Sequence, residues 1–472
     1  MGINRHIQFL IFVLLGLISS TFEGKSQLLF QVNSVDNINT RDYEEFAPVI
    51  YKDGIVIATY RKQQVYKVEL DMNEKEAITD LYFVSSDTIS KSGSLEFFSK
   101  ELNTSFHEAK CTFSKDGNTI YFTRNYNSKN EIYRAVKSGG DWGNQVLISL
   151  NSNEYAIKDP CLSQDGKKLY FASQAKDGFG GYDIYVSTFI RGDWSAPKNL
   201  GPSVNTSGNE VAPFIHPNGK LYFSSNKLPG LGRFDIFYTR EINGSWVKPI
   251  NLPEPINSNR DDNYYFSDAG DSTGYFSSNR NRSFDIFKFR SLWPKFENCK
   301  PLEKNEYTYL FSEKGSVNTD TTTWLYEWDF GDNTKKKVKE TEVEHTFPAP
   351  GEYMVQLNVI DTLTGEISMN EAAYQFEVKD VEQPYITCPE TVPLNTNVKF
   401  DASLTNLPEF KSIASYYWDF GDGDTGLGIT VDHAYILPGN FTVKLFVVSV
   451  PDESGIVKKA CVSKDIVVIP SS

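Results

Sequence analysis

Short runs of apolar and aromatic residues alternate with polar turns along most of the chain between residues 40 and 290. The fullest copy of this pattern reads Ser163-Gln-Asp-Gly-Lys-Lys-Leu-Tyr-Phe171, followed by Tyr182-Asp-Ile-Tyr185 and Gly192-Asp-Trp194. Runs such as Leu-Tyr-Phe and Asp-Ile-Tyr are short and rich in β-prone side chains, so they predict strands. Each copy of the pattern therefore predicts a group of about four short strands separated by turns.

The pattern returns five times. Its turn glycines are spaced by 63, 49, 53 and 51 residues and are Gly54, Gly117, Gly166, Gly219 and Gly270. A repeat near 50 residues that carries several strands is typical of the blades of a β-propeller. Trp142, Trp194 and Trp246 recur at intervals of 52 residues, and we expect them to fill the same groove between successive blades.

The sequence thus predicts an all-β chain with a β-propeller over residues 27–296, built from five blades, with six as the alternative. The fourth strand of the last copy is weak. The segment 28–35 resembles the end of a blade, because Val35-Asp-Asn-Ile-Asn-Thr40 parallels Ser203-Val-Asn-Thr206. We therefore expect the N-terminal strand to complete the last blade and close the ring.

The motif Ser-x-Asp-Gly-x-x-Leu-Tyr-Phe followed by Asp-Ile-Tyr resembles the TolB-type, WD-like propeller repeat. The version with Leu-Tyr-Phe-Ser-Ser-Asn and Gly-Asp-Trp-Ser-x-Pro resembles propellers of Bacteroidota envelope proteins. Several of those carry an OmpA-type peptidoglycan-binding domain and belong to, or resemble, the type IX secretion and gliding machinery. No OmpA-like domain is recognised here, so the resemblance does not imply direct anchoring to the cell wall.

A different repeat begins near residue 300. Trp328-Asp-Phe-Gly-Asp332 and Trp418-Asp-Phe-Gly-Asp422 are near-copies, and each is followed by a histidine and a Pro-Gly pair at the same spacing. This combination resembles the PKD domain, an immunoglobulin-like β-sandwich, and implies two such domains at residues 297–380 and 381–472. We expect the tryptophans to lie on inner strands and the aspartates to bind turn amides, a structural role for Trp328, Asp329, Trp418 and Asp419.

The N-terminal segment 1–26 has the pattern of an export signal, with Arg5 and His6 before an apolar run that is too short to span a bilayer. We expect a chain exported to the periplasm or held peripherally at the outer membrane, with the cell surface as the alternative and no transmembrane segment. The formal net charge is −14 and there is no basic stripe, so nucleic acid is a poor candidate partner.

Five cysteines in an exported chain leave at least one unpaired. Cys388 and Cys461 lie near the first and last strands of the second PKD-like segment, so a disulfide between them is expected. Cys111 and Cys161 lie one repeat apart and are expected to be two buried hydrophobic side chains.

Acidic residues precede the innermost strands of successive blades and are the strongest candidates for a binding site. Glu45, Glu108, Glu210 and Asp261 each lie three residues before the position equivalent to Pro213. Innermost strands line the central channel, so these carboxylates are expected to converge at one of its mouths. There they would bind a cation or a sugar, or supply an acid/base pair; the alternative is that such strand-entry positions are polar by default.

Other recurring polar residues favour structural roles. The acids that open the third strands, Asp183, Asp235 and Asp285, repeat in successive blades, which indicates a hydrogen bond inside each blade. No histidine pair or Cys-x-x-Cys has metal-ligand spacing, and the Asp-rich turn at residues 419–424 lacks the later glutamate of a calcium loop, so no metal site is predicted. No phosphate-binding loop or nucleophile motif is present, and no cofactor is predicted.

These observations favour a non-catalytic exported scaffold, with a propeller that docks an envelope protein and PKD modules that act as spacers or adhesion domains. Two alternatives stay open. One is a glycan-binding protein for polysaccharide or peptidoglycan, and the other is a polysaccharide hydrolase or lyase that uses the acids at the channel mouth.

Overall fold

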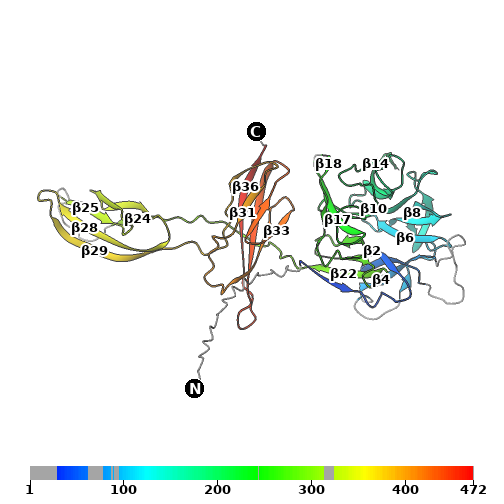
Figure 1. Ribbon diagram of the computed structural model, residues 1–472, viewed down its shortest axis with the longest axis horizontal. Coiled ribbons are helices and arrows are strands. Elements are labelled where there is room, and N and C mark those ends of the chain that lie inside the picture. The colour runs from blue at the N-terminus through cyan, green and yellow to red at the C-terminus, as the bar shows by residue number, and fades with distance from the viewer. Residues whose placement is uncertain are drawn as a thin grey trace, which may run out of the picture. The chain divides into compact units, whose positions relative to one another are not determined.

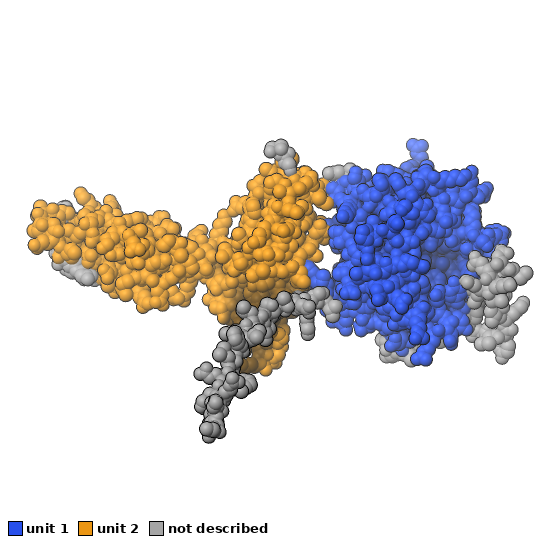
Figure 2. Space-filling model, viewed as in Figure 1, with its two compact units in different colours: residues 1–293 blue, residues 294–472 orange. Residues whose placement is uncertain are grey.

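The computed structural model describes residues 29–61, 78–86, 89, 95–242, 244–312 and 324–470, and all its described elements are β-strands (Figure 1). The predicted export signal at 1–26 lies outside these residues. The described part of the chain contains no helix capable of crossing a bilayer. Two compact units divide the chain between Trp293 and Pro294 (Figure 2).

The described residues of the first unit form five antiparallel sheets. The first consists of β2 (Glu45–Tyr51), β3 (Gly54–Thr59), β4 (Asp80–Ser85) and β5 (Glu96–Phe97). The second consists of β6 (His107–Phe113), β7 (Thr119–Tyr126), β8 (Lys129–Ser138) and β9 (Asp141–Leu147). The third consists of β10 (Ile157–Leu162), β11 (Lys168–Ser173), β12 (Asp183–Ile190), β13 (Asp193–Trp194) and β14 (Lys198–Asn199).

The fourth sheet consists of β15 (Glu210–Ile215), β16 (Lys220–Ser225), β17 (Asp235–Ile242), β18 (Ser245–Trp246) and β19 (Ile250–Asn251). The fifth consists of β20 (Asp262–Ser267), β21 (Thr273–Ser278), β22 (Asp285–Ser291) and the N-terminal strand β1 (Phe30–Ser34). The predicted pairing of the N-terminal strand with the last sheet is therefore found, from Phe30 opposite Ser291 to Ser34 opposite Phe287. In Figure 1 the blue start of this unit lies beside the green β22.

The first strands of the five sheets contact one another in cyclic order: β2 with β6, β6 with β10, β10 with β15, β15 with β20, and β20 with β2. They form the innermost layer of a closed ring. The repeated tryptophans pack between successive sheets, because each indole ring contacts the tyrosine ring of the preceding sheet. The ring centroids of Trp142 and Tyr51, Trp194 and Tyr121, and Trp246 and Tyr170 lie 6.3, 5.9 and 6.3 Å apart.

The second unit contains two modules. The first module has a four-stranded sheet and a two-stranded sheet that share one aromatic core around Trp328. Its strands are β24 (Thr308–Ser312), β25 (Trp324–Asp329), β26 (Lys335–Val338), β27 (Glu342–Thr346), β28 (Gly351–Asp361) and β29 (Ile367–Val378).

The second module repeats this plan around Trp418. Its strands are β23 (Lys300–Pro301), β30 (Thr391–Pro393), β31 (Val398–Asp401), β32 (Ile413–Asp419), β33 (Thr425–Leu427), β34 (Thr430–His433), β35 (Gly439–Ser449) and β36 (Lys459–Ile469). The short strand β23 precedes the first module in sequence but pairs in parallel with β36 of the second. Residues 300–301, which the sequence placed at the start of the first PKD segment, therefore pair with the sheet of the second module.

The disulfide differs from the one predicted from sequence, because β23 pairs with β36. The bridge joins Cys299 to Cys461, with their Cα atoms 4.6 Å apart, and Cys388 is a free thiol. Because β23 runs beside Val462 and Ser463, Cys299 just before it arrives next to Cys461. Cys388 lies before β30 and contacts β36 through Lys464, whose Nζ donates a hydrogen bond to the Cys388 carbonyl oxygen at 2.6 Å. The prediction of Cys388–Cys461 failed because it treated the segment around Cys299 as a linker.

Candidate functional site

A bulge interrupts each of the five innermost strands at the same place. In every case the pairing with the second strand of the sheet shifts its register at that point. One residue per strand occupies the bulge, and we call these five residues the bulge layer: Ala47, Lys110, Asp159, Ala212 and Tyr264. Four of them, all but Lys110, have φ between 53° and 57°. Bulges re-aim side chains, so this layer is where the innermost strands present groups differently from the rest of the sheet.

Three bulge-layer side chains meet inside the ring. Lys110 Nζ lies 5.8 Å from the centre of the Tyr264 ring, although β6 and β20 belong to sheets separated by that of β2. Asp159 Oδ2 accepts a hydrogen bond from the Ala212 amide at 3.2 Å and lies 3.5 Å from Lys158 Nζ. These contacts between different sheets place a lysine, an aspartate and a tyrosine across the centre of the ring.

Lys110 is unusual because its ammonium group is buried without a matching acceptor. The residue is 2 % exposed, and within the described residues Nζ has no hydrogen-bond partner. Burial lowers the pKa of Lys110, while the nearby Cys161, Asp159 and Cys111 act in the opposite direction. A buried donor left unpaired is costly, so the position calls for an explanation.

A cavity of about 410 Å³ opens where the innermost strands begin, and we call it the polar mouth. Six aromatic residues contribute to its wall: Phe46, Tyr60, Tyr182, Phe234, Tyr264 and Phe284. Its polar lining consists of Glu44, Lys158, Asn209, Arg233, Asp261 and Asn263. Asn263 is 7 % exposed, and its Oδ1 atom has no hydrogen-bond partner among the residues that the structure describes.

The opposite ends of the same strands line a second cavity of about 360 Å³, which we call the apolar mouth. Its wall includes Val49, Phe113, Leu162, Phe214, Ile215 and Phe266. The Cys161 thiol belongs to this wall and is buried, which raises its pKa. The two mouths therefore differ in their lining, although β2, β10, β15 and β20 contribute to both; β6 contributes only to the apolar mouth.

Of the four predicted channel acids, only Asp261 lines the polar mouth. Its carboxylate accepts hydrogen bonds from Arg233 Nη2 and from Asn279 Nδ2, both at 3.1 Å. Glu45, Glu108 and Glu210 are fully buried instead. The expectation that the four carboxylates converge at the mouth is therefore wrong for these three.

The three buried glutamates hold the turns that lead into their strands. In each case a threonine four or five residues earlier donates both its amide and its hydroxyl to the carboxylate. For Glu210 both bonds from Thr206 are 2.7 Å long. Asp262, not Asp261, makes the same pair of bonds in the fifth sheet, to Ser258 at 2.7 and 2.8 Å. The sequence alignment of the fifth repeat was thus one residue out of register.

Arginines complete three of these anchors. Arg61 Nη2 lies 3.3 Å from Glu45 Oε1, and Arg124 Nε donates to Glu108 Oε1 at 2.7 Å. In the fifth sheet Arg280 Nη2 donates to Asp262 Oδ1 at 2.6 Å. Burial nevertheless raises the pKa of Glu45 and of Glu108 to about 7, against the lowering effect of the threonine and arginine contacts. Burial also raises the pKa of Glu210. These carboxyl groups act as internal anchors, and none of the three faces the cavity.

The acids that open the third strands bind the loops before them. Asp183 Oδ2 accepts from the Phe179 amide at 2.5 Å and from Asn199 Nδ2 at 3.0 Å. Asp235 Oδ2 accepts from the Gly232 amide at 3.0 Å. Asp285 lies at the same position in β22, where burial raises its pKa and contacts with Asn281 and Ser283 lower it.

The PKD-like motifs also bind their own turns. Trp328 and Trp418 are 2 % and 0 % exposed. Asp329 Oδ1 accepts from the Gly331 amide at 3.1 Å, and Asp419 Oδ1 accepts from the Gly421 amide at 3.0 Å.

A histidine closes each of these turns, because His345 Nε2 and His433 Nε2 each lie 2.8 Å from the second aspartate of their motif. Among the described residues one group of acid and imidazole side chains has ligand atoms within 4.8 Å of one another, and it consists of Asp422, Asp424 and His433.

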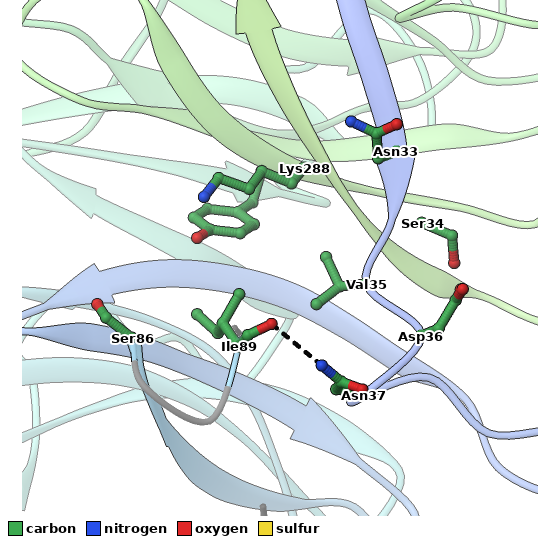
Figure 3. A pocket seen from close by; sticks show the side chains of 9 residues that line it. Asn33, Ser34, Val35, Asp36, Asn37, Ser86, Ile89 and Lys288 are labelled. Carbon is green, nitrogen blue, oxygen red and sulfur yellow. Dashed lines mark hydrogen bonds between the residues drawn. The ribbon is translucent and has the colours of Figure 1, made fainter. Parts of the chain in front are cut away.

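A further cavity of about 390 Å³ lies beside the ring closure (Figure 3). Asn33, Ser34 and Asp36 line it from β1 and the residues after it, and Lys288 reaches it from β22. Asn37 Nδ2 donates to the Ile89 carbonyl at 3.3 Å across one edge. Unlike the polar mouth, its lining contains no buried side-chain atom identified as lacking a partner among the described residues.

Comparison with known proteins supports the assignment of the second unit. The PKD domain family model matches residues 301–375 and 381–468. Human polycystin-1-like protein 1 is 25 % identical over 131 residues, and human polycystin-1 is 30 % identical over 129 residues. These matches cover 28 % and 26 % of this chain but only 4 % and 3 % of the human proteins, so the chain spans a small fraction of their length.

Solved structures resembling the chain include two described as TolB. The putative TolB of Agrobacterium tumefaciens has a TM-score of 0.34 and 12 % identity, over 75 % of this chain and 90 % of that one. TolB of Acinetobacter baumannii has a TM-score of 0.31 and 14 % identity, over 60 % and 57 % of the two chains. At these TM-scores the likeness carries no inference about function.

The residues that sequence reasoning missed are Lys110, Asp159 and Tyr264. Each lies two positions after the residue that begins its strand or anchors its entry turn. These entry residues are Glu108, Ile157 and Asp262, respectively. A correct register for the fifth repeat would have aligned them with Ala47 and Ala212. The contrast of charged and aromatic side chains with two alanines was a usable signal.

Proposed function

We propose that this chain is a non-catalytic binding protein of the cell envelope or cell exterior, whose five sheets act as a five-bladed propeller with its binding site at the polar mouth. In this proposal the two PKD modules are immunoglobulin-like sandwiches that serve as spacer or adhesion domains. The observation that carries the proposal is Asn263 Oδ1, a buried polar atom without a partner among the described residues, in the lining of an aromatic-walled cavity. Binding pockets combine mostly apolar walls with a few such polar groups.

Export supports the envelope location. The export-signal pattern at 1–26 and the resemblance of the repeats to TolB-type propellers of Bacteroidota favour the periplasm or the periphery of the outer membrane, with the cell surface as the alternative. PKD modules are consistent with either location. The partner predicted from sequence was an envelope protein, with a polysaccharide or peptidoglycan as the alternative, and both stay open at this level.

A binding role fits the site better than hydrolysis. The hydrolase alternative required several carboxylates at the channel mouth, but Glu45, Glu108 and Glu210 are buried anchors. Asp261 is held in place by Arg233 and Asn279. A glycosidase needs one carboxyl group free to donate a proton beside a second that acts as base or nucleophile.

The test is retention of the purified full chain on immobilised envelope fractions, one of protein and one of polysaccharide. Arg233→Ala removes a 75 %-exposed side chain at the polar mouth, so we expect it to weaken retention. Lys168→Ala is the matched control, because this lysine is 44 % exposed and pairs with Glu241, which does not line the mouth. Equal retention of wild type and Arg233→Ala would contradict the proposal.

A further inference from the structure

One repeat position at the polar mouth is aromatic in three consecutive sheets. It is the residue just before the acid of the third strand, and it is Tyr182, Phe234 and Phe284 in the third, fourth and fifth sheets. The first and second sheets have Thr79 and Asn130 at this position. All three aromatic residues line the polar mouth, whereas Thr79 and Asn130 do not. We call the three aromatic residues the aromatic arc.

Backbone hydrogen bonds fix the aromatic arc to the neighbouring sheets. The carbonyl oxygen of each arc residue accepts a hydrogen bond from the amide of the anchor residue at the strand entry of the next sheet. The donor amides are those of Glu210, Asp262 and Glu45, at 2.7, 2.8 and 2.8 Å in turn. Because all three anchor residues are buried, the arc is built on a rigid frame. A preformed surface of this kind loses little conformational freedom when a ligand binds.

The two cationic side chains in the lining of the mouth are already paired with carboxylates. Arg233 Nη2 lies 3.1 Å from Asp261 Oδ2, and Lys158 Nζ lies 3.5 Å from Asp159 Oδ2. Lys158 Nζ also lies 4.7 Å from the centre of the Tyr182 ring. An anionic ligand would compete with these carboxylates, and a cationic ligand would be placed beside the two existing cations. The lining therefore favours a ligand without charge.

The polar group that such a ligand must supply is a hydrogen-bond donor. Asn263 Oδ1 is the one buried side-chain atom of the lining that lacks a partner among the described residues, and a carboxamide oxygen only accepts. Phe234 and Phe284 are half-buried and offer rings on which an apolar face can pack. The ligand therefore needs an apolar face next to a hydroxyl or N–H group.

A saccharide meets these requirements better than a peptide does. A sugar ring has C–H faces that pack on aromatic rings, and hydroxyl groups surround its edge. Each hydroxyl both donates and accepts a hydrogen bond, so it can satisfy Asn263 Oδ1 without requiring a further donor from the wall. A peptide segment would also bring backbone carbonyl groups, which only accept and would be costly to bury without donors.

We propose that the polar mouth binds an uncharged saccharide, with a sugar ring packed on Phe234 and Phe284 and a hydroxyl group donated to Asn263 Oδ1. This inference rests on the proposed function, since it names the ligand class of the same mouth. A polypeptide ligand and a charged saccharide are outcomes of the test below.

The test is calorimetric titration of the full-length protein with a panel of short probes. Three are uncharged tetrasaccharides, of β-linked glucose, β-linked N-acetylglucosamine and α-linked mannose. The other two are a tetrasaccharide of galacturonic acid and a tetrapeptide capped at both ends. At least one uncharged tetrasaccharide should bind about 10-fold or more tightly than the galacturonic acid probe. Its affinity should change by less than about 2-fold between about 0.05 M and about 0.5 M salt, because salt screens only interactions between charges.

Variants of the wall separate recognition from folding. Phe234→Ala and Phe284→Ala should each weaken the best uncharged probe by about 3- to 10-fold, whereas Phe284→Tyr keeps the ring and should bind like the wild type. Phe284→Leu keeps most of the volume, so it tests the aromatic face even if the alanine variant fails to fold. Asn263→Ala should weaken binding by about 2- to 10-fold through the lost hydrogen bond.

Phe189→Ala is the matched control for the aromatic substitutions. Phe189 is 44 % exposed near the far end of β12 and does not line the polar mouth, so this variant should bind like the wild type. Melting temperatures of all variants, measured in the same samples, show which of them are folded.

Several results would overturn the inference. They are tighter binding of the galacturonic acid probe, a steep loss of affinity with salt, wild-type affinity in both Phe284→Leu and Asn263→Ala, and no binding of any probe. Tighter binding of the capped tetrapeptide would reassign the mouth to a polypeptide. If these titrations fail while Arg233→Ala still loses retention on envelope fractions, the proposed function stands and only the ligand class is wrong.

Discussion

The second unit and the ring both consist of repeats, but they use repetition differently. In the second unit the two modules share the aromatic and turn contacts of their common motif. The imidazole of His345 stacks on Phe330 with centroids 3.7 Å apart, and His433 stacks on Phe420 at 4.0 Å. In the ring the five innermost strands share a bulge, yet the residues in it range from alanine to lysine.

This difference shows where each kind of role is found. Contacts that recur between copies, such as the Thr–Glu anchors of three sheets of the ring or the Asp–His pairs of both modules, hold the local fold. Residues that depart from their copies at one position, such as Lys110 beside Ala47 and Ala212, are free to take another role. The following predictions test that division, beginning with the largest expected effect.

The disulfide is the main contact that the second module has and the first lacks. Cys461→Ser should reduce the free energy of unfolding of the second module by up to about 5 kcal/mol, because the bridge closes a sequence separation of 162 residues. The folded first module lies inside that loop and should reduce the effect. Hydrogen exchange of the full chain, read peptide by peptide, measures each module separately.

Cys388→Ser is the control for that experiment, because Cys388 is a free thiol. It should leave exchange in the second module close to that of the wild type. Equal destabilisation by both substitutions would contradict the assignment of Cys299 as the partner of Cys461.

The two core tryptophans should have similar but unequal importance. Trp328→Ala and Trp418→Ala should each reduce the stability of their own module by about 3–5 kcal/mol through the cavity they leave. Trp418 Nε1 also donates to the Gly428 carbonyl at 2.8 Å, whereas Trp328 Nε1 has no partner among the described residues. The Trp418 substitution should therefore cost about 1 kcal/mol more. Hydrogen exchange of the full chain measures the loss of stability in each module. Equal losses, or a larger loss for Trp328→Ala, would contradict the prediction.

The glutamate anchors predict a pH dependence of the ring. Burial raises the pKa of Glu45 and of Glu108 to about 7 in the folded ring. In the unfolded chain both carboxyl groups have the lower pKa of an ordinary glutamate. Between these two pKa values the folded ring therefore binds protons that the unfolded chain has released. The stabilisation is fully present below the unfolded-state pKa and is lost as pH rises through about 7.

The melting temperature of the ring should therefore fall between pH 5 and pH 8, by about 2–4 °C for each kcal/mol lost. Differential scanning calorimetry of the full chain gives this profile. The double variant Glu45→Gln, Glu108→Gln should flatten it, because glutamine does not titrate. A profile equally steep in the variant would show that other groups cause the slope.

Lys110→Met should have the smallest effect on stability. The substitution removes an ammonium group that makes no hydrogen bond within the described residues, and its aliphatic replacement suits a buried position. The melting temperature should stay within the change expected for about 1 kcal/mol, or rise. Glu108→Ala, which breaks a repeated anchor, should destabilise the ring by more than this. The reverse order would place Lys110 among the structural residues.

Much of the strand pattern followed from local sequence. The β-prone runs and turn glycines predicted the strands, and the similarity of residues 35–40 to 203–206 predicted the pairing of β1 with β22. The repeated Trp-Asp-Phe-Gly-Asp motif predicted the PKD modules, which the family model matches. These predictions succeeded because each rests on residues close together in the chain.

The errors came from long-range register. Pairing of β23 with β36 joins residues more than 150 positions apart, and no local pattern near Cys299 announces it. A glutamate at the start of a strand is expected from sequence to be exposed, but Glu45 and Glu210 are buried. Side chains alternate between the two faces of a strand, and the next residues, Phe46 and Val211, line the polar mouth instead. The candidate site depends on which side chains meet across the ring, which no single repeat contains.

The central claim is that the polar mouth, and not the apolar one, is the binding site. Hydrogen exchange of the full-length protein, alone and saturated with the soluble envelope fraction that retains it, tests it most directly. The account predicts protection of the strand entries around Phe46, Lys158 and Asn263, with no change at the turn of residues 216–219 beside the apolar mouth. Protection confined to that turn and to Phe266–Ala269 would contradict it.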